Sequence, residues 1–383
     1  MNSSFHPSPP LLKRNGWSIG PALLLAVILL AIATTARALV IVPVWDSTIT
    51  NDPNVAAITN TINMAIQFYE MRFANPITVN IEFKETTSGL SESDWYYYNI
   101  FYTQFLTNLQ QHATTANDTY ALAHLPYGLS NTAPPSLTNP VNGDTIIRVH
   151  SANLRAIGLT NYISELPGGV DGIVSLNTSI MNLTRTSIDP SKYDLLSVAE
   201  HEMDEVLGLG SGLQDSDGPF PQDLFRYSSA GARTFTTSGD DAWFSLDGTN
   251  LLVQFNQQSD GDYGDWHTSS TPRVQDAFGT PGATPDMGVE LIALDVQGYD
   301  LLPPPQPGIV SIALSGTNLV VTGTNGLATG TYYLLASTNV ALALNQWPRV
   351  ATSFMTNNGN FTFTATNAVN PQSARQFYIL QLQ

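Results

Sequence analysis

The segment 192–209 carries the side chains with the clearest chemical potential in this sequence of 383 residues. It reads KYDLLSVAEHEMDEVLGL, and most of its apolar residues fall on one broad arc of a helical wheel. His201 and Glu205 are four residues apart on the polar arc, so their side chains project next to each other. Imidazole nitrogen and carboxylate oxygen are both ligands that Zn²⁺ accepts. The pattern therefore predicts a helix over 192–209 that binds a metal ion through His201 and Glu205.

Glu202 is the exception in this pattern, because it falls inside the apolar arc, between Val198 and Val206. A helix with one solvated polar face would explain the polar arc. It would leave Glu202 buried, however, and a buried carboxylate without a partner is costly. In a metallopeptidase helix, the carboxylate one residue after the first ligand is the general base for water. Glu202 is thus the candidate catalytic residue.

At this point the chain resembles the secreted bacterial metallopeptidases of the metzincin kind. The helix of that family ends at a glycine three residues after the second ligand, and Gly208 stands there in this chain. Three further segments carry the resemblance over most of 39–302: 223–227 (DLFRY), 242–248 (AWFSLDG) and 291–300 (LIALDVQGYD). The resemblance implies an α+β catalytic domain, with a mixed sheet and an active-site helix, that uses zinc to hydrolyse peptide bonds. The motif here is His-Glu-x-x-Glu, with Glu205 in place of the family's second histidine.

A strand-like segment, GIVSL at Gly172–Leu176, precedes the helix. In the metzincin family the strand before the active helix pairs with substrate. The resemblance therefore implies that a peptide substrate contacts Ile173, Val174, Ser175 and Leu176.

The third metal ligand does not follow from the helix motif. The family's third ligand stands three residues after the glycine, where this chain has Ser211, and a hydroxyl is a poor ligand for zinc. His267 is the first candidate, followed by Asp217 and Asp215; the alternative for His267 is an ordinary histidine of a surface loop. Met287 is either the methionine turn of the family or plain core.

A second cation site is a further hypothesis. Asp260, Asp262 and Asp265 lie in the glycine-rich sequence DGDYGD, and carboxylate oxygens in such a loop suit Ca²⁺. The spacing is not that of an EF-hand, because glycine stands at the fifth position and Thr271 at the twelfth. A solvated acidic turn is the alternative.

The rest of 39–302 mixes helices and strands. Runs of apolar and alternating residues predict strands at 39–44, 77–83, 145–149 and Gly172–Leu176. Helical periodicity predicts helices at 55–73, 95–109 and 289–296.

A proline-rich spacer, PPPQPG at 303–308, divides 39–302 from 309–383. Short apolar and β-branched runs in 309–383 alternate with Gly, Asn and Ser, which predicts a small all-β sandwich domain. Residues 330–347 and 376–380 resemble a β module found at the C-terminus of exported bacterial proteins. We expect an accessory or attachment role, with a partner that the sequence does not define.

The N-terminus has the pattern of a secretory signal peptide over 1–38. Lys13 and Arg14 precede an apolar run over 19–33, and Ala36 and Ala38 have the small-x-small spacing of a cleavage site. The run is short for a membrane span, which needs about 20 apolar residues. An uncleaved anchor helix is the alternative. We expect an exported protein, extracellular, periplasmic or on the cell surface, without a stable membrane span after cleavage.

The composition limits the partners of the mature protein. The formal charge is −17, and removal of 1–38 takes away three cations and no acid, which moves it to −20. Such an acidic surface argues against nucleic acid and anionic membranes as partners. The chain has no cysteine, so no disulfide stabilises it after export.

These sequence features are consistent with two functions. The first is an exported metal-dependent endopeptidase that acts on proteins or peptides, with Glu202 as general base. The alternative is a catalytically impaired scaffold that serves as a secreted binding or surface protein, which Glu205 and Ser211 at ligand positions favour.

Overall fold

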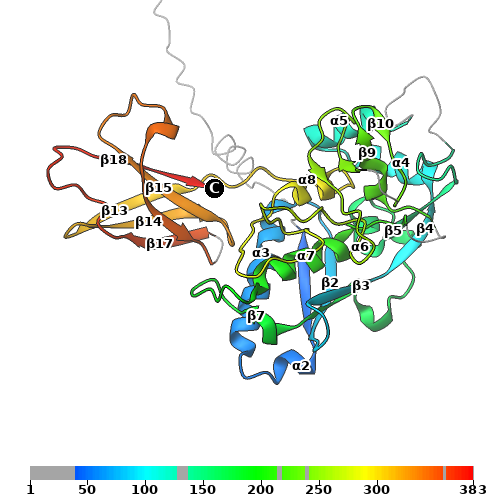
Figure 1. Cartoon of the computed structure of the whole chain (residues 1–383), viewed down its shortest axis with the longest axis horizontal. Coiled ribbons are helices and arrows are strands. Elements are labelled where there is room, and N and C mark those ends of the chain that lie inside the picture. Colours follow the sequence, from blue (N-terminus) through cyan, green and yellow to red (C-terminus); the bar gives the residue numbers. More distant parts are fainter. Residues whose placement is uncertain (1–38, 127–136, 214–217, 238–240, 357–358, 383) are drawn as a thin grey trace, which may run out of the picture. The chain divides into compact units, whose positions relative to one another are not determined.

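The computed structural model describes residues 39–382 apart from 127–136, 214–217, 238–240 and 357–358 (Figure 1). The predicted signal peptide over 1–38 lies outside the described residues, and so do the candidate ligands Asp215 and Asp217. Within the described residues the chain is mixed α/β, with several β-sheets and a few helices. No helix in this part of the chain is long and apolar enough to cross a membrane.

A four-stranded sheet forms the centre of the body that precedes the proline-rich spacer. Its strand order is β1-β2-β6-β3, with bounds Val40–Trp45, Thr78–Glu85, Gly172–Leu176 and Ser91–Trp95. The first three strands are parallel, and β3 pairs antiparallel with β6. Alternate residues of β2 point to one face, where Val79, Ile81 and Phe83 are fully buried.

Two helices, α3 (Val55–Arg72) and α7 (Leu195–Leu207), pack against each other, and α7 also contacts β3 and β6 (Figure 1). Tyr69 joins the two helices, since its hydroxyl donates to the Glu200 carbonyl at 2.9 Å and to Asp204 at 2.8 Å. The helix α7 is shorter than the predicted 192–209. It begins after Asp194, whose side chain accepts a hydrogen bond from the Ser197 N–H, and it ends at Gly208 with φ +147°.

The predicted helix over 95–109 is wrong in its first half. Residues Ser91–Trp95 and Tyr97–Phe101 are strands β3 and β4, and helix α4 covers Tyr102–Gln111. The run of Trp and Tyr favours extended backbone, and β4 pairs with β5 (Ile146–His150). Burial recurs with helical spacing only from Tyr102 onward.

Short elements complete this body. The helices are α2 (Ser47–Thr50), α5 (Ala116–His124), α6 (Ser151–Ala156) and α8 (Val289–Asp295). The 3₁₀ turns are η1 (Thr160–Tyr162), η2 (Pro167–Gly169), η3 (Thr178–Ile180) and η4 (Pro221–Phe225). Strands β7 (Met181–Asn182) and β8 (Tyr193–Asp194) form one pair. A small sheet of order β10-β9-β11-β12 is built from Ala232–Arg233, Arg226–Ser229, Trp243–Phe244 and Val253–Gln254.

The described residues of the C-terminal part form β-strands and one 3₁₀ turn, η5 (Leu344–Gln346). One antiparallel sheet has the order β13-β14-β17, with bounds Gly308–Ser315, Asn318–Gly326 and Gly359–Ala365. The other has the order β16-β15-β18, with bounds Arg349–Phe354, Thr331–Ser337 and Phe377–Leu382. Both sheets contribute apolar residues to the core, including Leu319 and Val321 from β14 and Tyr332 and Leu334 from β15.

Candidate metal centre

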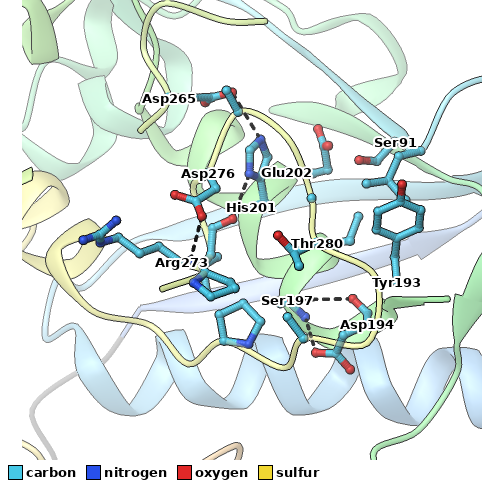
Figure 2. A pocket seen from close by; sticks show the side chains of 18 of the residues that line it. Ser91, Tyr193, Asp194, Ser197, His201, Glu202, Asp265, Arg273, Asp276 and Thr280 are labelled. Carbon is cyan, nitrogen blue, oxygen red and sulfur yellow. Dashed lines mark hydrogen bonds and ion pairs between the residues drawn. The ribbon is translucent and has the colours of Figure 1, made fainter. Parts of the chain in front are cut away.

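A polar cleft of about 420 Å³ is lined by α7, by the start of β3 and by the segment 272–285 (Figure 2). His201, Glu202 and Glu205 enter it from α7, and Asp262 and Asp265 enter it from a separate loop. The residues predicted to do chemistry in the helix thus share one cavity.

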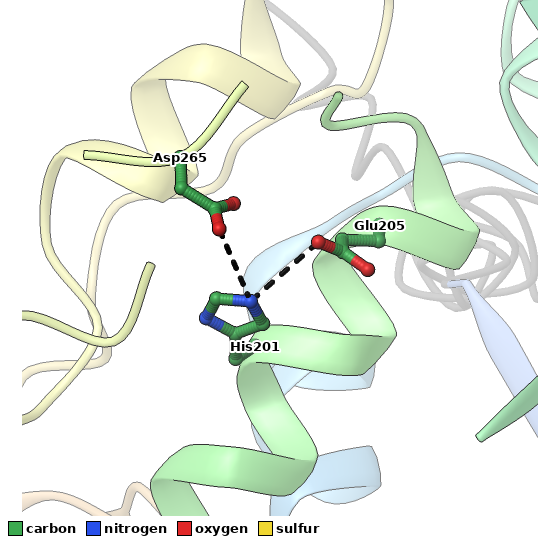
Figure 3. A group of neighbouring side chains, drawn as sticks. All are labelled: His201, Glu205 and Asp265. Atoms are coloured by element: carbon green, nitrogen blue, oxygen red, sulfur yellow. Dashed lines mark ion pairs between the residues drawn. The ribbon is translucent and has the colours of Figure 1, made fainter. Parts of the chain in front are cut away.

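Three side chains converge in this cleft: His201, Glu205 and Asp265 (Figure 3). The His201 Nε2 atom lies 3.5 Å from Glu205 Oε1 and 3.8 Å from Asp265 Oδ2. One ligand atom from each residue lies within 4.8 Å of the other two. This group could hold a metal ion, because imidazole nitrogen and carboxylate oxygen are common metal ligands in proteins.

Each of the three side chains is oriented by a second contact. The His201 Nδ1–H donates to the Val274 carbonyl at 3.0 Å, which leaves the Nε2 lone pair facing the two carboxylates. The Ser93 hydroxyl donates to Glu205 Oε2, and the Gln275 amide donates to Asp265 Oδ1 at 2.9 Å. Such outer contacts fix the ring and carboxylate orientations in metal sites.

The electrostatics of the group favour a cation. Burial alone would lower the pKa of His201, but the charges of Asp265 and Glu205 raise it well above its usual value. Burial raises the pKa of Asp265 to about 8, although His201 opposes this. Burial also disfavours the charged form of Glu205, yet its hydrogen bond with His201 lowers its pKa below the usual value. The raised pKa of His201 shows that the two acidic side chains stabilise positive charge at the imidazole, while burial makes the charged form of Asp265 costly.

Glu202 is buried in the cleft wall, with 4% of its surface exposed. Burial, followed by the charge of Glu205, raises the pKa of Glu202 to about 8, while His201 and the Ser91 hydroxyl oppose the rise. Figure 2 shows Glu202 beside Ser91. Glu202 is therefore a carboxyl group in the cleft wall that is outside the three-residue group, as its place on the helix predicts.

His267 was predicted as the third ligand, but the described residue that joins His201 and Glu205 in a group able to hold a metal ion is Asp265. The backbone is extended at Trp266, which forms a β-bridge with Phe255. Residues 265 and 267 are on the same side of such a segment but about 7 Å apart, so only one of them can reach His201. The buried Trp266, whose indole N–H donates to Glu290 at 3.0 Å, fixes this register.

The calcium hypothesis treated Asp260, Asp262 and Asp265 as one cluster, and the structure places two of them, Asp262 and Asp265, in the wall of the cleft. Among the described residues, Asp265 groups with His201 and Glu205. Asp262 lines the cleft, whereas Asp260 is not part of its wall.

Ile173, Val174, Ser175 and Leu176 were predicted to bind substrate as a sheet edge, but the strand order places them in an internal strand. Strand β6 lies between β2 and β3, so its backbone hydrogen bonds are used within the sheet. Its neighbour β3 ends the sheet and lines the cleft. Of the two edge strands, β1 and β3, it is β3 that contributes residues to the cleft.

Two other residues from the sequence have structural contacts. The Ser211 hydroxyl donates to Asp223 Oδ1 at 2.6 Å and is not part of the three-residue group. The Met287 sulfur lies 3.8 Å from the Tyr69 hydroxyl, which itself bonds Asp204 of α7. Met287 is thus part of the packing around Tyr69.

Sequence reasoning missed Asp265 as a partner of His201, and it missed Ser91 and Ser93 altogether. The signal for the serines was the sequence SESDW at Ser91–Trp95, a strand with polar residues at four successive positions. A strand that packs one face on a helix normally alternates polar with apolar residues.

Comparisons with models of protein families, with curated proteins and with solved structures gave no match.

Proposed function

We propose that this chain is an exported, metzincin-like endopeptidase in which His201, Glu205 and Asp265 bind Zn²⁺. The observation that supports the proposal is the convergence of these three side chains in an open cleft, next to the buried carboxyl of Glu202. One imidazole and two carboxylates form a set of three protein ligands, the number found in catalytic zinc sites. Two carboxylates offset the charge of a divalent ion, which makes this site a weaker Lewis acid than one with three histidines.

A divalent zinc ion supplies Lewis acidity and makes water nucleophilic at neutral pH. In the proposed reaction Glu202 accepts the proton of the attacking water and returns it to the leaving amine. Its position suits this role, because it faces the cleft but belongs to the helix turn that carries His201. The Ser91 hydroxyl favours the charged form of Glu202.

Strand β3 supplies the place for a peptide substrate. It is the last strand of the sheet, and Ser91, Glu92 and Ser93 line the cleft. An extended peptide added to this edge would gain main-chain hydrogen bonds and lie along the three-residue group. This arrangement supports protein or peptide, rather than a small molecule, as the substrate.

A secreted binding protein is the second candidate. Glu205 replaces the usual histidine, and Ser211 occupies the usual third-ligand position and bonds Asp223. A scaffold that keeps the metal without turnover would have the same geometry.

The deciding experiment measures the zinc content of purified mature protein beside its activity on an unfolded protein substrate. His201→Ala should lose zinc and activity together, because only two ligands remain. Glu202→Gln should keep zinc and lower kcat by about 10²–10⁴-fold, because it removes the proton acceptor with little change in volume. Glu165→Gln, at an exposed position outside the cleft, is the matched control.

The outcomes separate the two candidates. Wild-type protein that binds zinc but cleaves no substrate would favour the secreted binding protein over the endopeptidase. Wild-type protein that binds no divalent metal, together with His201→Ala of unchanged stability, would refute the metal site itself.

A further inference from the structure

Strand β3 has hydroxyl groups opposite apolar residues of the neighbouring strand β6. Ser93 pairs with Val174 and Ser91 pairs with Leu176, and residues paired across antiparallel strands share a face. Both partners on β6 are fully buried, and both β3 and β6 pack against α7. Ser91 and Ser93 therefore face the helix that carries the candidate metal ligands.

The contact made by Ser93 is with a candidate ligand. Its hydroxyl donates to Glu205 Oε2, while Glu205 Oε1 is the oxygen that lies 3.5 Å from His201 Nε2. Hydrogen bonds to an ionised carboxylate are about twice as strong as those between neutral groups. One oxygen of Glu205 is thus held by the strand, and the other is presented to the metal position.

The two other ligands are oriented by a different part of the chain. His201 bonds the Val274 carbonyl and Asp265 bonds the Gln275 amide, and these two contacts come from adjacent residues in one loop. Ser93 is the contact that orients Glu205 from the sheet. Ser91, although it faces the same helix, is next to Glu202, which is not a ligand.

We propose that Ser93 is a positioning residue of the metal centre, which fixes the Glu205 carboxylate for metal binding. The inference rests on the proposed function, because it requires that Glu205 is a metal ligand. Strand β3 would then have two roles. Its free edge would bind a peptide substrate, and its Ser93 side chain would orient the metal ligand Glu205.

The test is a zinc titration of the full mature chain against a chromophoric chelator. Loss of an outer contact of a metal ligand lowers metal affinity by about 10–100-fold. Ser93→Thr and Ser93→Val have the same shape and differ in the hydroxyl. Zinc binding by Ser93→Thr should stay near that of wild type, whereas Ser93→Val and Ser93→Ala should bind zinc about 10–100-fold more weakly. Ser91→Ala should leave zinc affinity unchanged, because its neighbour is not a ligand.

Thermal unfolding of the metal-free variants shows whether the substitutions disturb the fold. Equal melting temperatures for Ser93→Thr and Ser93→Val, with a large difference in zinc affinity, would support the inference. Equal zinc affinities for these two variants would overturn it and leave the metal site intact. A wild-type chain without zinc affinity would instead overturn the proposed function, and this inference with it.

Discussion

Gly172 provides a sensitive test of how closely α7 approaches the sheet. It lies on β6 opposite Trp95 of β3, and a Cβ atom at this position would lie 2.6 and 2.8 Å from the two Cγ atoms of Val206. The same Cβ would lie 2.7 Å from the Asp94 carbonyl oxygen. Because non-bonded carbons pack at about 3.5–4.0 Å, Gly172→Ala must move the helix or the strand by about 1 Å.

The energetic cost follows from this overlap. Overpacking costs about 1–3 kcal/mol, and a more restricted unfolded chain returns about 0.4–1 kcal/mol. Gly172→Ala should therefore lower the free energy of unfolding by about 1–2 kcal/mol, measured by urea denaturation of the metal-free protein. Its zinc affinity should also fall, since a displaced α7 carries Glu205 away from Ser93.

A double-mutant cycle tests the proposed cause. Val206→Ala removes the two Cγ atoms but leaves the Asp94 carbonyl in place. The Gly172→Ala/Val206→Ala variant should thus lose less free energy of unfolding than the sum of the losses of the two single variants. The recovery should be partial, because the overlap with the Asp94 carbonyl remains. Additive losses, or a Gly172→Ala protein as stable as wild type, would refute the argument for close packing at this point.

Two other predictions use the same protein. Asp265→Asn should weaken zinc binding at least 10-fold, whereas His267→Ala should leave zinc affinity within about twofold of wild type. The chelator titration measures both affinities. A larger loss of zinc affinity in His267→Ala than in Asp265→Asn would favour His267 as the ligand. Deletion of 309–383 should leave 39–302 folded, because a proline-rich spacer separates the two segments. Calorimetry of the truncated protein should show one cooperative unfolding transition. A truncated protein that is insoluble or unfolds without cooperativity would contradict two autonomous domains.

Features set by local sequence were accessible without a structure. The pairing of His201 with Glu205 follows from helical geometry alone, and the structure places their side chains 3.5 Å apart. The burial of Glu202 follows from its position in the apolar arc, and 4% of its surface is exposed. Both inferences need only the period of a helix.

Features set by contacts between distant segments were not accessible. Asp265 reaches His201 because Trp266 and Phe255 pair across a loop, and no local pattern defines that register. The strand order that places β3 rather than β6 at the sheet edge is also non-local. The start of the predicted helix over 95–109 was wrong because pairing with β5 favours extended backbone for β4.

The three-residue group joins two distant parts of a chain that contains no cysteine. Glu205 and Asp265 are about 60 residues apart, so an ion bound to both would close a loop of that length. A covalent cross-link over about 60 residues restricts the unfolded chain by roughly 4 kcal/mol in the loop-entropy treatment of disulfides. The same ion would then act as a removable cross-link, so the supply of metal would set the stability of the folded chain as well as the occupancy of the cleft.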